Sequence, residues 1–191
     1  VRLVKGIDSR DVLQMRIDMG AMQLEVDGRP DGEMPGSFEP YYDLLASEVL
    51  HGGDEFVMSE EQCREADREF VQFYHRRICW LALRHYENAV RDATHTLRLM
   101  DLCRQHSPDE EWTLTHEQYR PFVLFHRTQA GALAALEDTD DGAEVAIAAI
   151  NAGLDELRGF FDDYEIEDRF EDDEFVSRLI ELRESVRERF S

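Results

Sequence analysis

The chain has 191 residues, with 21 basic against 43 acidic side chains and a net charge of −22. A field of this sign repels phosphate backbones and anionic lipid surfaces, so we expect neither direct nucleic-acid binding nor membrane association. The length suits one domain, or one domain with an appendage, and buries a core without disulfides or metals. Three widely spaced cysteines without a metal-binding pattern favour a reducing, cytoplasmic location.

The charge is uneven along the chain. Residues 1–58 carry a net −7 and residues 136–191 a net −13, whereas residues 59–106 balance to zero. Lys5 is the only lysine, so arginine supplies nearly all of the positive charge. Genome base composition is one explanation, and a use of bidentate arginine contacts is the other. The middle of the chain is therefore a neutral, arginine-bearing segment inside an acidic protein.

Residues 1–58 predict an appendage built on a β-hairpin. Apolar residues alternate from Leu13 to Met19 and resume in the opposite phase after Gly20, as a β-bulge at that glycine would produce. Val1–Lys5 is suited to pair with this strand across a turn at residues 7–10. A short amphipathic helix is the alternative for the alternating segment.

A loop and a short helix complete this appendage. Asp27–Gly32 combines Pro, Asp and Gly in a turn-forming order, and the glycines and prolines of residues 32–40 continue the loop. The following residues predict a helix at Tyr41–Leu50 that Gly52 and Gly53 close.

Residues 59–191 predict an all-α domain of about five helices arranged as antiparallel hairpins. Ser59-Glu60-Glu61-Gln62 has the form of a capping box, which starts helices. Neither Gly nor Pro occurs from there to His106, a segment too long for one ordinary globular helix. We therefore predict two helices joined by a tight turn near Arg84.

Three further helices are predicted beyond the break at Ser107–Glu110. They run from Thr115 to about Glu137, from Ala143 to Phe161 and from about Asp172 to Phe190, with a loop at residues 138–142. Nine of the 13 residues from Asp162 to Glu174 are acidic, which we interpret as a charged surface.

The hairpin pattern occurs twice. Phe73–Arg77 is echoed 51 residues later by Leu124–Thr128. Ala89, Val90 and Leu97 are echoed at an offset of 57 by Ala146, Ile147 and Leu154. The second offset is six residues longer than the first, and this difference falls in the predicted loop before Ala143. Repeated hairpins build helical solenoids, because one hairpin cannot bury its apolar face alone.

Arg84–Leu97 resembles the second helix of a tetratricopeptide (TPR) repeat. The matching places are held by Tyr86, Ala89, Asp92 and Leu97. Trp80 falls where the first helix of that repeat has its aromatic residue, whereas Arg77 stands where a small residue is usual. The resemblance covers residues 66–163 and implies a TPR-like domain that contacts other proteins.

A second resemblance spans the whole chain. It is carried by Gln14–Gly20 with Gly28–Gly32, by His75–Arg77 and by Leu99–Asp101. These blocks are similar to bacterial proteins labelled as UvrB/UvrC-motif-containing, whose label implies an adaptor in DNA repair or stress response. The UVR motif itself would follow a helix such as Leu179–Phe190. Because the chain begins without Met and ends at Ser191, we expect a piece of a longer protein with that motif outside it.

The repeat places His75 and His126 at equivalent positions on the first helix of each hairpin. Arg76, Arg77 and Arg127 flank them. First helices line the concave face of a solenoid, so we predict that these five residues form a cationic patch. Such a patch would bind a protein partner through an acidic peptide segment.

The alternative for these arginines is internal. They would pair with Asp92, Asp101 or Glu69 and tie the helices together, because an arginine at a packed position needs a partner or an exit to water.

Other functional patterns are weak. His75 and Cys79 have the i, i+4 spacing of metal ligands, but no further ligand pair has a matching spacing. The sequence has no P-loop and no G-x-S-x-G motif, so we expect neither enzyme activity nor a cofactor. A buried histidine–carboxylate pair is the remaining route to an enzyme. The sequence thus favours a non-catalytic protein-interaction module, with the repair or stress-response adaptor as its alternative.

Overall fold

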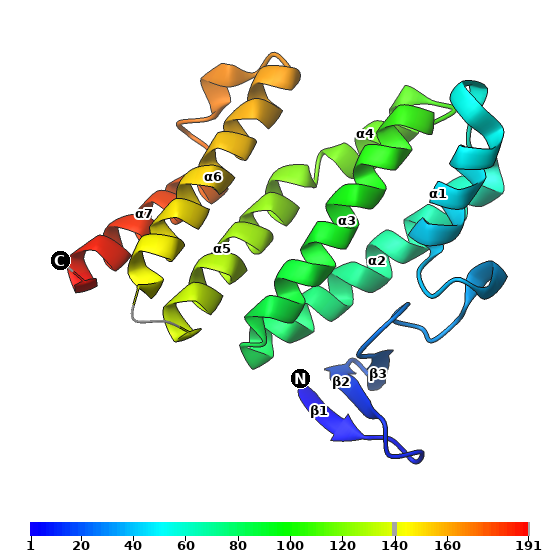
Figure 1. Cartoon of the computed structure of the whole chain (residues 1–191), viewed down its shortest axis with the longest axis horizontal. Helices are drawn as coiled ribbons and strands as arrows, with labels where there is room; N and C mark the ends of the chain where they lie inside the picture. The colour runs from blue at the N-terminus through cyan, green and yellow to red at the C-terminus, as the bar shows by residue number, and fades with distance from the viewer. Residues whose placement is uncertain (139–140, 191) are drawn as a thin grey trace.

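A computed structural model describes residues 1–138 and 141–190 of the chain. The protein is mainly α-helical, with a three-stranded antiparallel sheet at its N-terminus (Figure 1). Short 3-10 turns lie at Pro35–Ser37, Gly53–Glu55 and Glu167–Arg169. The strands and α-helices are β1 (Arg2–Lys5), β2 (Asp11–Ile17), β3 (Gly20–Glu25), α1 (Tyr41–Gly52), α2 (Glu60–Leu83), α3 (Tyr86–His106), α4 (Glu110–Glu117), α5 (Arg120–Asp138), α6 (Gly142–Asp163) and α7 (Glu174–Phe190).

Four long helices lie side by side, in the order α2, α3, α5 and α6 (Figure 1). Helix α7 packs on α6 and α5, and the short α4 connects α3 to α5. The expected mainly α class and antiparallel packing are confirmed. Beyond residue 59 the described residues form six helices rather than about five, and the additional one is α4.

The first hairpin begins and ends as its sequence predicts. Ser59 and Gln62 form a reciprocal capping box, in which the Ser59 backbone N–H donates to Gln62 Oε1 at 2.7 Å. Helix α2 ends at Leu83 and is capped by Arg84, whose φ of 60° is left-handed. The next backbone N–H, of His85, then donates to the Trp80 carbonyl at 2.9 Å. This turn reverses the chain into α3.

The predicted helix from Thr115 to Glu137 is wrong at its start. Thr115 lies inside α4, which Asp109 caps by accepting a hydrogen bond from the Glu111 backbone N–H at 2.9 Å. Helix α5 begins only at Arg120. Pro121 is tolerated in a first turn, where its missing N–H has no helical partner, but it would break a continuous helix.

The internal repeat is visible in what the helices bury. Residues of α3 and their equivalents 57 positions later in α6 are buried in pairs. These pairs are Ala89 and Ala146, Ala93 and Ile150, Leu97 and Leu154, and Met100 and Leu157. The predicted loop at residues 138–142 includes positions 139 and 140, which lie outside the described residues.

The N-terminal sheet has the order β1-β2-β3. The expected pairing of the first residues is confirmed, because Lys5 lies opposite Asp11 and Arg2 opposite Gln14. The bulge predicted at Gly20 is wrong. Ile17 pairs with Gly20, so Asp18 and Met19 form a hairpin turn, and the alternation changes phase because the chain reverses direction.

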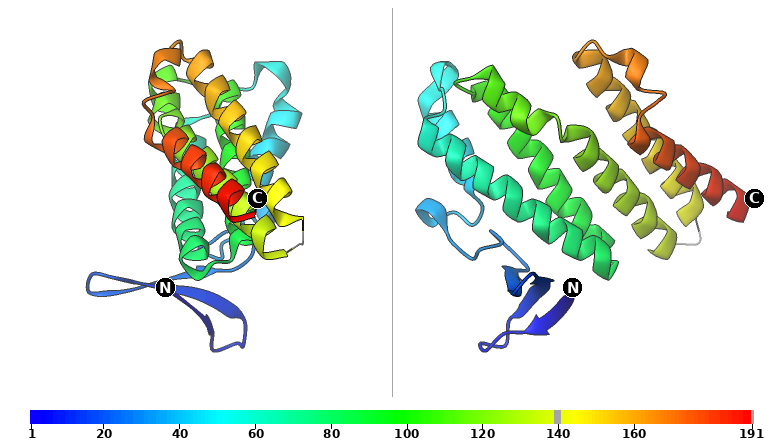
Figure 2. Two further views of the ribbon diagram at one scale, coloured as in Figure 1. Left: turned by 90° about the vertical axis from the view of Figure 1, so that its left-hand side faces the viewer. Right: turned by 180° about the vertical axis from the view of Figure 1, so that it is seen from behind.

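The sheet sits at one end of the helices and projects from them (Figure 2). Leu13 and Leu24 pack with Cys79 and Trp80 near the end of α2. The predicted short helix is confirmed as α1, whose buried Leu45 belongs to the main core. The three cysteines are free, buried thiols. In the described part of the chain, none of the helices has the length and apolarity needed to cross a membrane.

Candidate functional site

The five residues of the predicted patch do not form an open cationic surface. Arg76 and Arg77 each have an exposed fraction of 1%, and His126 is also buried. His75 and Arg127 are half-buried. The guanidinium of Arg127 pairs with Glu156 of α6. Arg76 and Arg77 lie on the side of α2 that packs against α3, so neighbouring helices cover both side chains.

Arg76 pairs internally with Asp92, as the alternative interpretation of the arginines expects. Its Nε and Nη2 donate to the two carboxylate oxygens of Asp92, at 2.7 and 2.9 Å. Its Nη1 donates to the carbonyls of Glu25 and Gly28, at 3.0 and 2.8 Å. Trp80 Nε1 also donates to Asp92, at 3.1 Å. This buried, charge-assisted cluster joins α2, α3 and the sheet, and gives Arg76 a structural role.

The other two acids named as internal partners are engaged elsewhere. Buried Glu69 accepts hydrogen bonds from the backbone N–H groups of Tyr41 and Tyr42, at 2.6 and 2.9 Å. It thereby satisfies the N-terminus of α1, where carboxylates are favoured. Asp101 pairs with Arg120 at 2.9 Å. Neither acid is left to neutralise Arg77.

Arg77 is a buried cation with uncharged partners. Its Nε donates to His126 Nδ1 at 3.2 Å, and its Nη1 donates to Thr96 Oγ1 at 3.1 Å. No carboxylate of the described residues forms an ion pair with it. Burial lowers the pKa of Arg77 to about 10, which still leaves the side chain charged at neutral pH.

His126 adds no second charge. Burial, with the nearby Arg77 charge, lowers the pKa of His126 to about 3. Its ring packs against Phe122, with 4.1 Å between ring centroids. At neutral pH the imidazole is therefore neutral and accepts the Arg77 hydrogen bond through Nδ1.

Arg77 and Thr96 line a groove of about 770 Å³ that α2, α3, α4, α5 and α7 form together. Three large side chains on its rim, Val71, Tyr74 and Tyr119, are exposed. Most of the remaining lining is apolar. It includes Phe70, Met100, Phe122, Val123 and Phe175.

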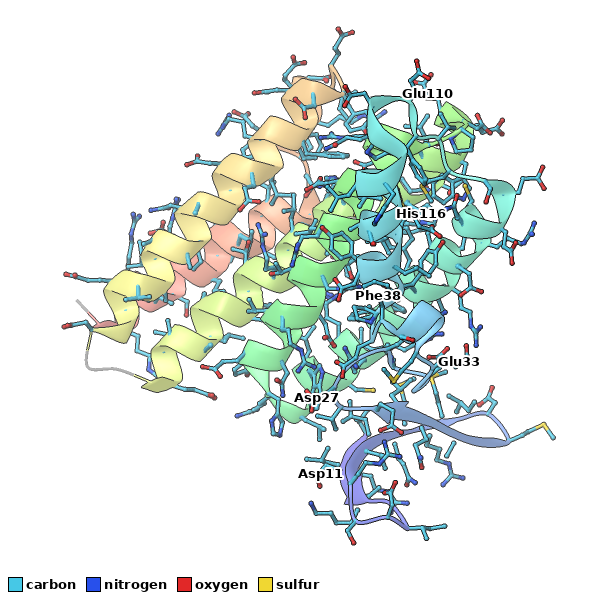
Figure 3. The ribbon with its side chains drawn as sticks, turned by 45° about the vertical axis from the view of Figure 1, so that its right-hand side comes forward. Asp11, Asp27, Glu33, Phe38, Glu110 and His116 are labelled. Atoms are coloured by element: carbon cyan, nitrogen blue, oxygen red, sulfur yellow. The ribbon has the colours of Figure 1, made fainter. Side chains whose placement is uncertain are left out.

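A histidine–aspartate pair also lies in the groove. His116 Nε2 is 2.6 Å from Asp67 Oδ1, which also accepts a hydrogen bond from Trp112 Nε1 at 3.0 Å. The imidazole stacks on Phe70, in the half of the helical part away from the sheet (Figure 3). Burial lowers the pKa of His116, against the opposing effect of Asp67. The pair fixes α4 on α2, and its 49-residue separation in sequence gave no spacing signal.

Within the described ranges, no group of three or more His, Cys, Asp or Glu side chains could hold a metal ion. Comparisons of the chain with protein-family models, with curated proteins and with solved structures found no match. The fold and the groove thus define a mainly helical protein of paired hairpins with an apolar groove, and any function has to be argued from that geometry.

Proposed function

We propose that this chain is a non-catalytic protein-interaction module of TPR-like type, which binds a segment of a partner protein across the groove formed by α2, α3, α4, α5 and α7. The observation that carries the proposal is the exposed apolar rim formed by Val71, Tyr74 and Tyr119. Val71 and Tyr74 lie on α2, the first helix of the first hairpin, and Tyr119 lies in the turn just before α5, the first helix of the second. First helices line the face that solenoids use for binding.

The chemistry of the rim supports a protein partner. A contiguous apolar patch on a soluble protein marks an interaction surface, and aromatic residues are enriched at such surfaces. The groove continues the patch inward between the helices, so a partner side chain has a place to insert. Because Arg76 is engaged internally, the expected partner segment is predominantly apolar rather than strongly acidic.

The test uses two matched valines. Val71 on the groove rim has an exposed fraction of 54%, and Val145 on α6, outside the groove, has one of 53%. Val71→Glu places a charge on the rim, whereas Val145→Glu makes the same change elsewhere. Wild type and both variants are used for affinity capture from a native lysate, followed by mass spectrometry, after circular dichroism has shown that all are folded.

We expect a protein captured by wild type to be retained by Val145→Glu and reduced at least tenfold by Val71→Glu. A buried charge without a partner costs more than the roughly 1.4 kcal/mol that a tenfold loss represents. Equal capture by the two variants would contradict the proposal.

A further inference from the structure

Arg77 is exceptional among the buried arginines. Three arginines are buried in the described part of the chain: Arg29 at 2%, and Arg76 and Arg77 at 1% exposed. Arg29 pairs with Asp31 and Glu65, and Arg76 pairs with Asp92. Arg77 has no acidic partner among the described residues. Burying a charge is costly unless it is paired, and Arg77 has only the longer-range attraction of Asp92 in place of the direct ion pairs that the other two form.

One nitrogen of Arg77 remains available. Nε and Nη1 donate to His126 and Thr96, whereas Nη2 has no hydrogen-bond acceptor among the described residues. Every fully buried side-chain nitrogen or oxygen that the structure describes has a partner. Nη2 is therefore not completely enclosed, and Arg77 is one of the residues that line the groove. A guanidinium presented in this way is suited to donate to an oxygen anion.

The walls beside Arg77 suit an apolar body. Phe70, Met100, Phe122 and Phe175 line the groove, whose volume of about 770 Å³ is in the range of small-molecule sites. Such sites combine predominantly apolar walls with a few placed polar groups. Here Arg77 is the placed cation, and the Asp67 carboxylate in the same groove is engaged by His116 and Trp112.

The charge of the surroundings limits the ligand to one negative group. His126 is neutral, and His116 is engaged with Asp67, so neither supplies a second free cation. The chain as a whole carries −22, which repels phosphates, dicarboxylates and acidic peptides. A single carboxylate on an apolar chain satisfies Arg77 and meets less of this repulsion than a multiply charged ligand does.

We propose that the inner end of the groove is a binding site for a small apolar monocarboxylate, with its carboxylate on Arg77 Nη2 and its apolar chain along Phe70, Phe122 and Phe175. This inference goes beyond protein docking, because the ligand is a small molecule held below the rim.

The test compares decanoate with 1-decanol, by titration calorimetry at neutral pH and below the concentration at which decanoate forms micelles. Both probes have the same apolar chain, and only decanoate carries a charge. For wild type we expect decanoate to bind at least tenfold more tightly than decanol, because its carboxylate accepts a charge-assisted hydrogen bond from Arg77 that is stronger than one to a hydroxyl. Inorganic phosphate should not bind measurably.

Two arginine variants locate the effect. Arg77→Met removes the buried guanidinium, and the two probes should then bind within about twofold of each other. Arg127→Met removes the neighbouring, half-buried arginine that pairs with Glu156, and should keep the wild-type preference. The wild-type comparison stands by itself if Arg77→Met does not fold.

Three results would overturn the proposal: no binding of decanoate to wild type, equal binding of decanoate and decanol, or a preference for decanoate that survives in folded Arg77→Met. These titrations contain only this chain and a probe. Their failure would leave the capture of a partner protein through Val71 unaffected, and failure of that capture would leave the titrations unaffected.

Discussion

The two helical hairpins bury apolar residues at equivalent positions but join their helices by different chemistry. In α2–α3, Arg76 pairs with Asp92. The equivalent of Arg76 in α5–α6 is Arg127. It pairs with Glu156, and this ion pair is partly exposed. The first hairpin thus contains a buried ion pair, and the second carries its ion pair at the surface.

The next position shows the same contrast. Arg77 donates to Thr96 in the first hairpin, whereas the equivalent residues in the second are Thr128 and Gly153. A Cβ atom added at Gly153 would lie 2.1 Å from Thr128 Oγ1, so α5 and α6 approach too closely for any side chain there. A hydrogen bond holds the first pair of helices, and close steric fit holds the second.

The difference follows from what each hairpin supports. Arg76 donates to the carbonyls of Glu25 and Gly28, and Arg91 donates to the Val26 carbonyl, so the first hairpin anchors the end of β3 and the loop that follows it. Asp27, which pairs with Arg91, lies where the sheet meets the helices (Figure 3). Backbone carbonyls need donors, and apolar packing supplies none. Among the described residues, no hydrogen bond or ion pair joins the second hairpin to the sheet.

The largest effect should come from breaking the buried ion pair. Asp92→Asn leaves the Arg76 guanidinium buried without a counter-charge, and we expect the free energy of unfolding to fall by about 3–5 kcal/mol. Urea denaturation at pH 7 measures this loss. Glu156→Gln, which breaks the surface pair with Arg127, is the control and should cost less than about 1 kcal/mol. Similar losses for the two variants would refute the contrast between the hairpins.

The next effect tests the close fit of the second hairpin. Gly153→Ala forces Thr128 away from the helix, and we expect overpacking to destabilise the protein by about 2–3 kcal/mol. Gly159 lies in the same helix, and a Cβ there meets nothing within 4 Å. Gly159→Ala should therefore stabilise the protein slightly, by up to about 1 kcal/mol. Thermal unfolding of the two variants compares them, and the account fails if Gly153→Ala is as stable as Gly159→Ala.

A smaller effect concerns His126, which lies between the two hairpins. Its pKa is about 3 in the folded protein, against an ordinary value of about 6.5 in the unfolded chain. Below pH 6.5 the unfolded chain takes up a proton that the folded protein does not, so stability is lost as the pH falls towards 3. Between pH 7 and pH 5 this loss amounts to about 2 kcal/mol.

His126→Asn isolates that contribution, because the amide oxygen can still accept from Arg77 but the side chain cannot titrate. Urea denaturation at pH 7 and pH 5 should show a loss about 2 kcal/mol smaller in the variant than in wild type. Parallel pH dependences would show that His126 is not held neutral by burial.

Local signals predicted much of the fold. The capping box at Ser59 and the left-handed turn at Arg84 involve neighbouring residues, so the sequence contains the whole interaction. The phase change at Gly20 was misinterpreted because a bulge and a hairpin turn alter the alternation in the same way. Helix α4 was missed because Asp109 and Thr115 are both plausible caps, and only the first is used.

The site was less predictable, because its contacts are distant in sequence. Asp92 was named as a partner for the arginines, but which arginine it would take depends on how α2 and α3 pack. Asp67 and His116 are 49 residues apart, and no periodic pattern links them. The one available signal for the groove was Arg77, which occupies a position where the TPR pattern has a small residue.

The most direct test of the account is methyl NMR of the wild-type protein during a titration with decanoate. Met100, Val123 and Val71 line the groove near Arg77, and Val145 lies on α6 outside it. The account predicts saturable shifts of the Met100 and Val123 methyl resonances, smaller shifts at Val71 on the rim, and none at Val145. Shifts at Val145 as large as those at Met100, or no saturable shift at Met100 and Val123, would contradict it.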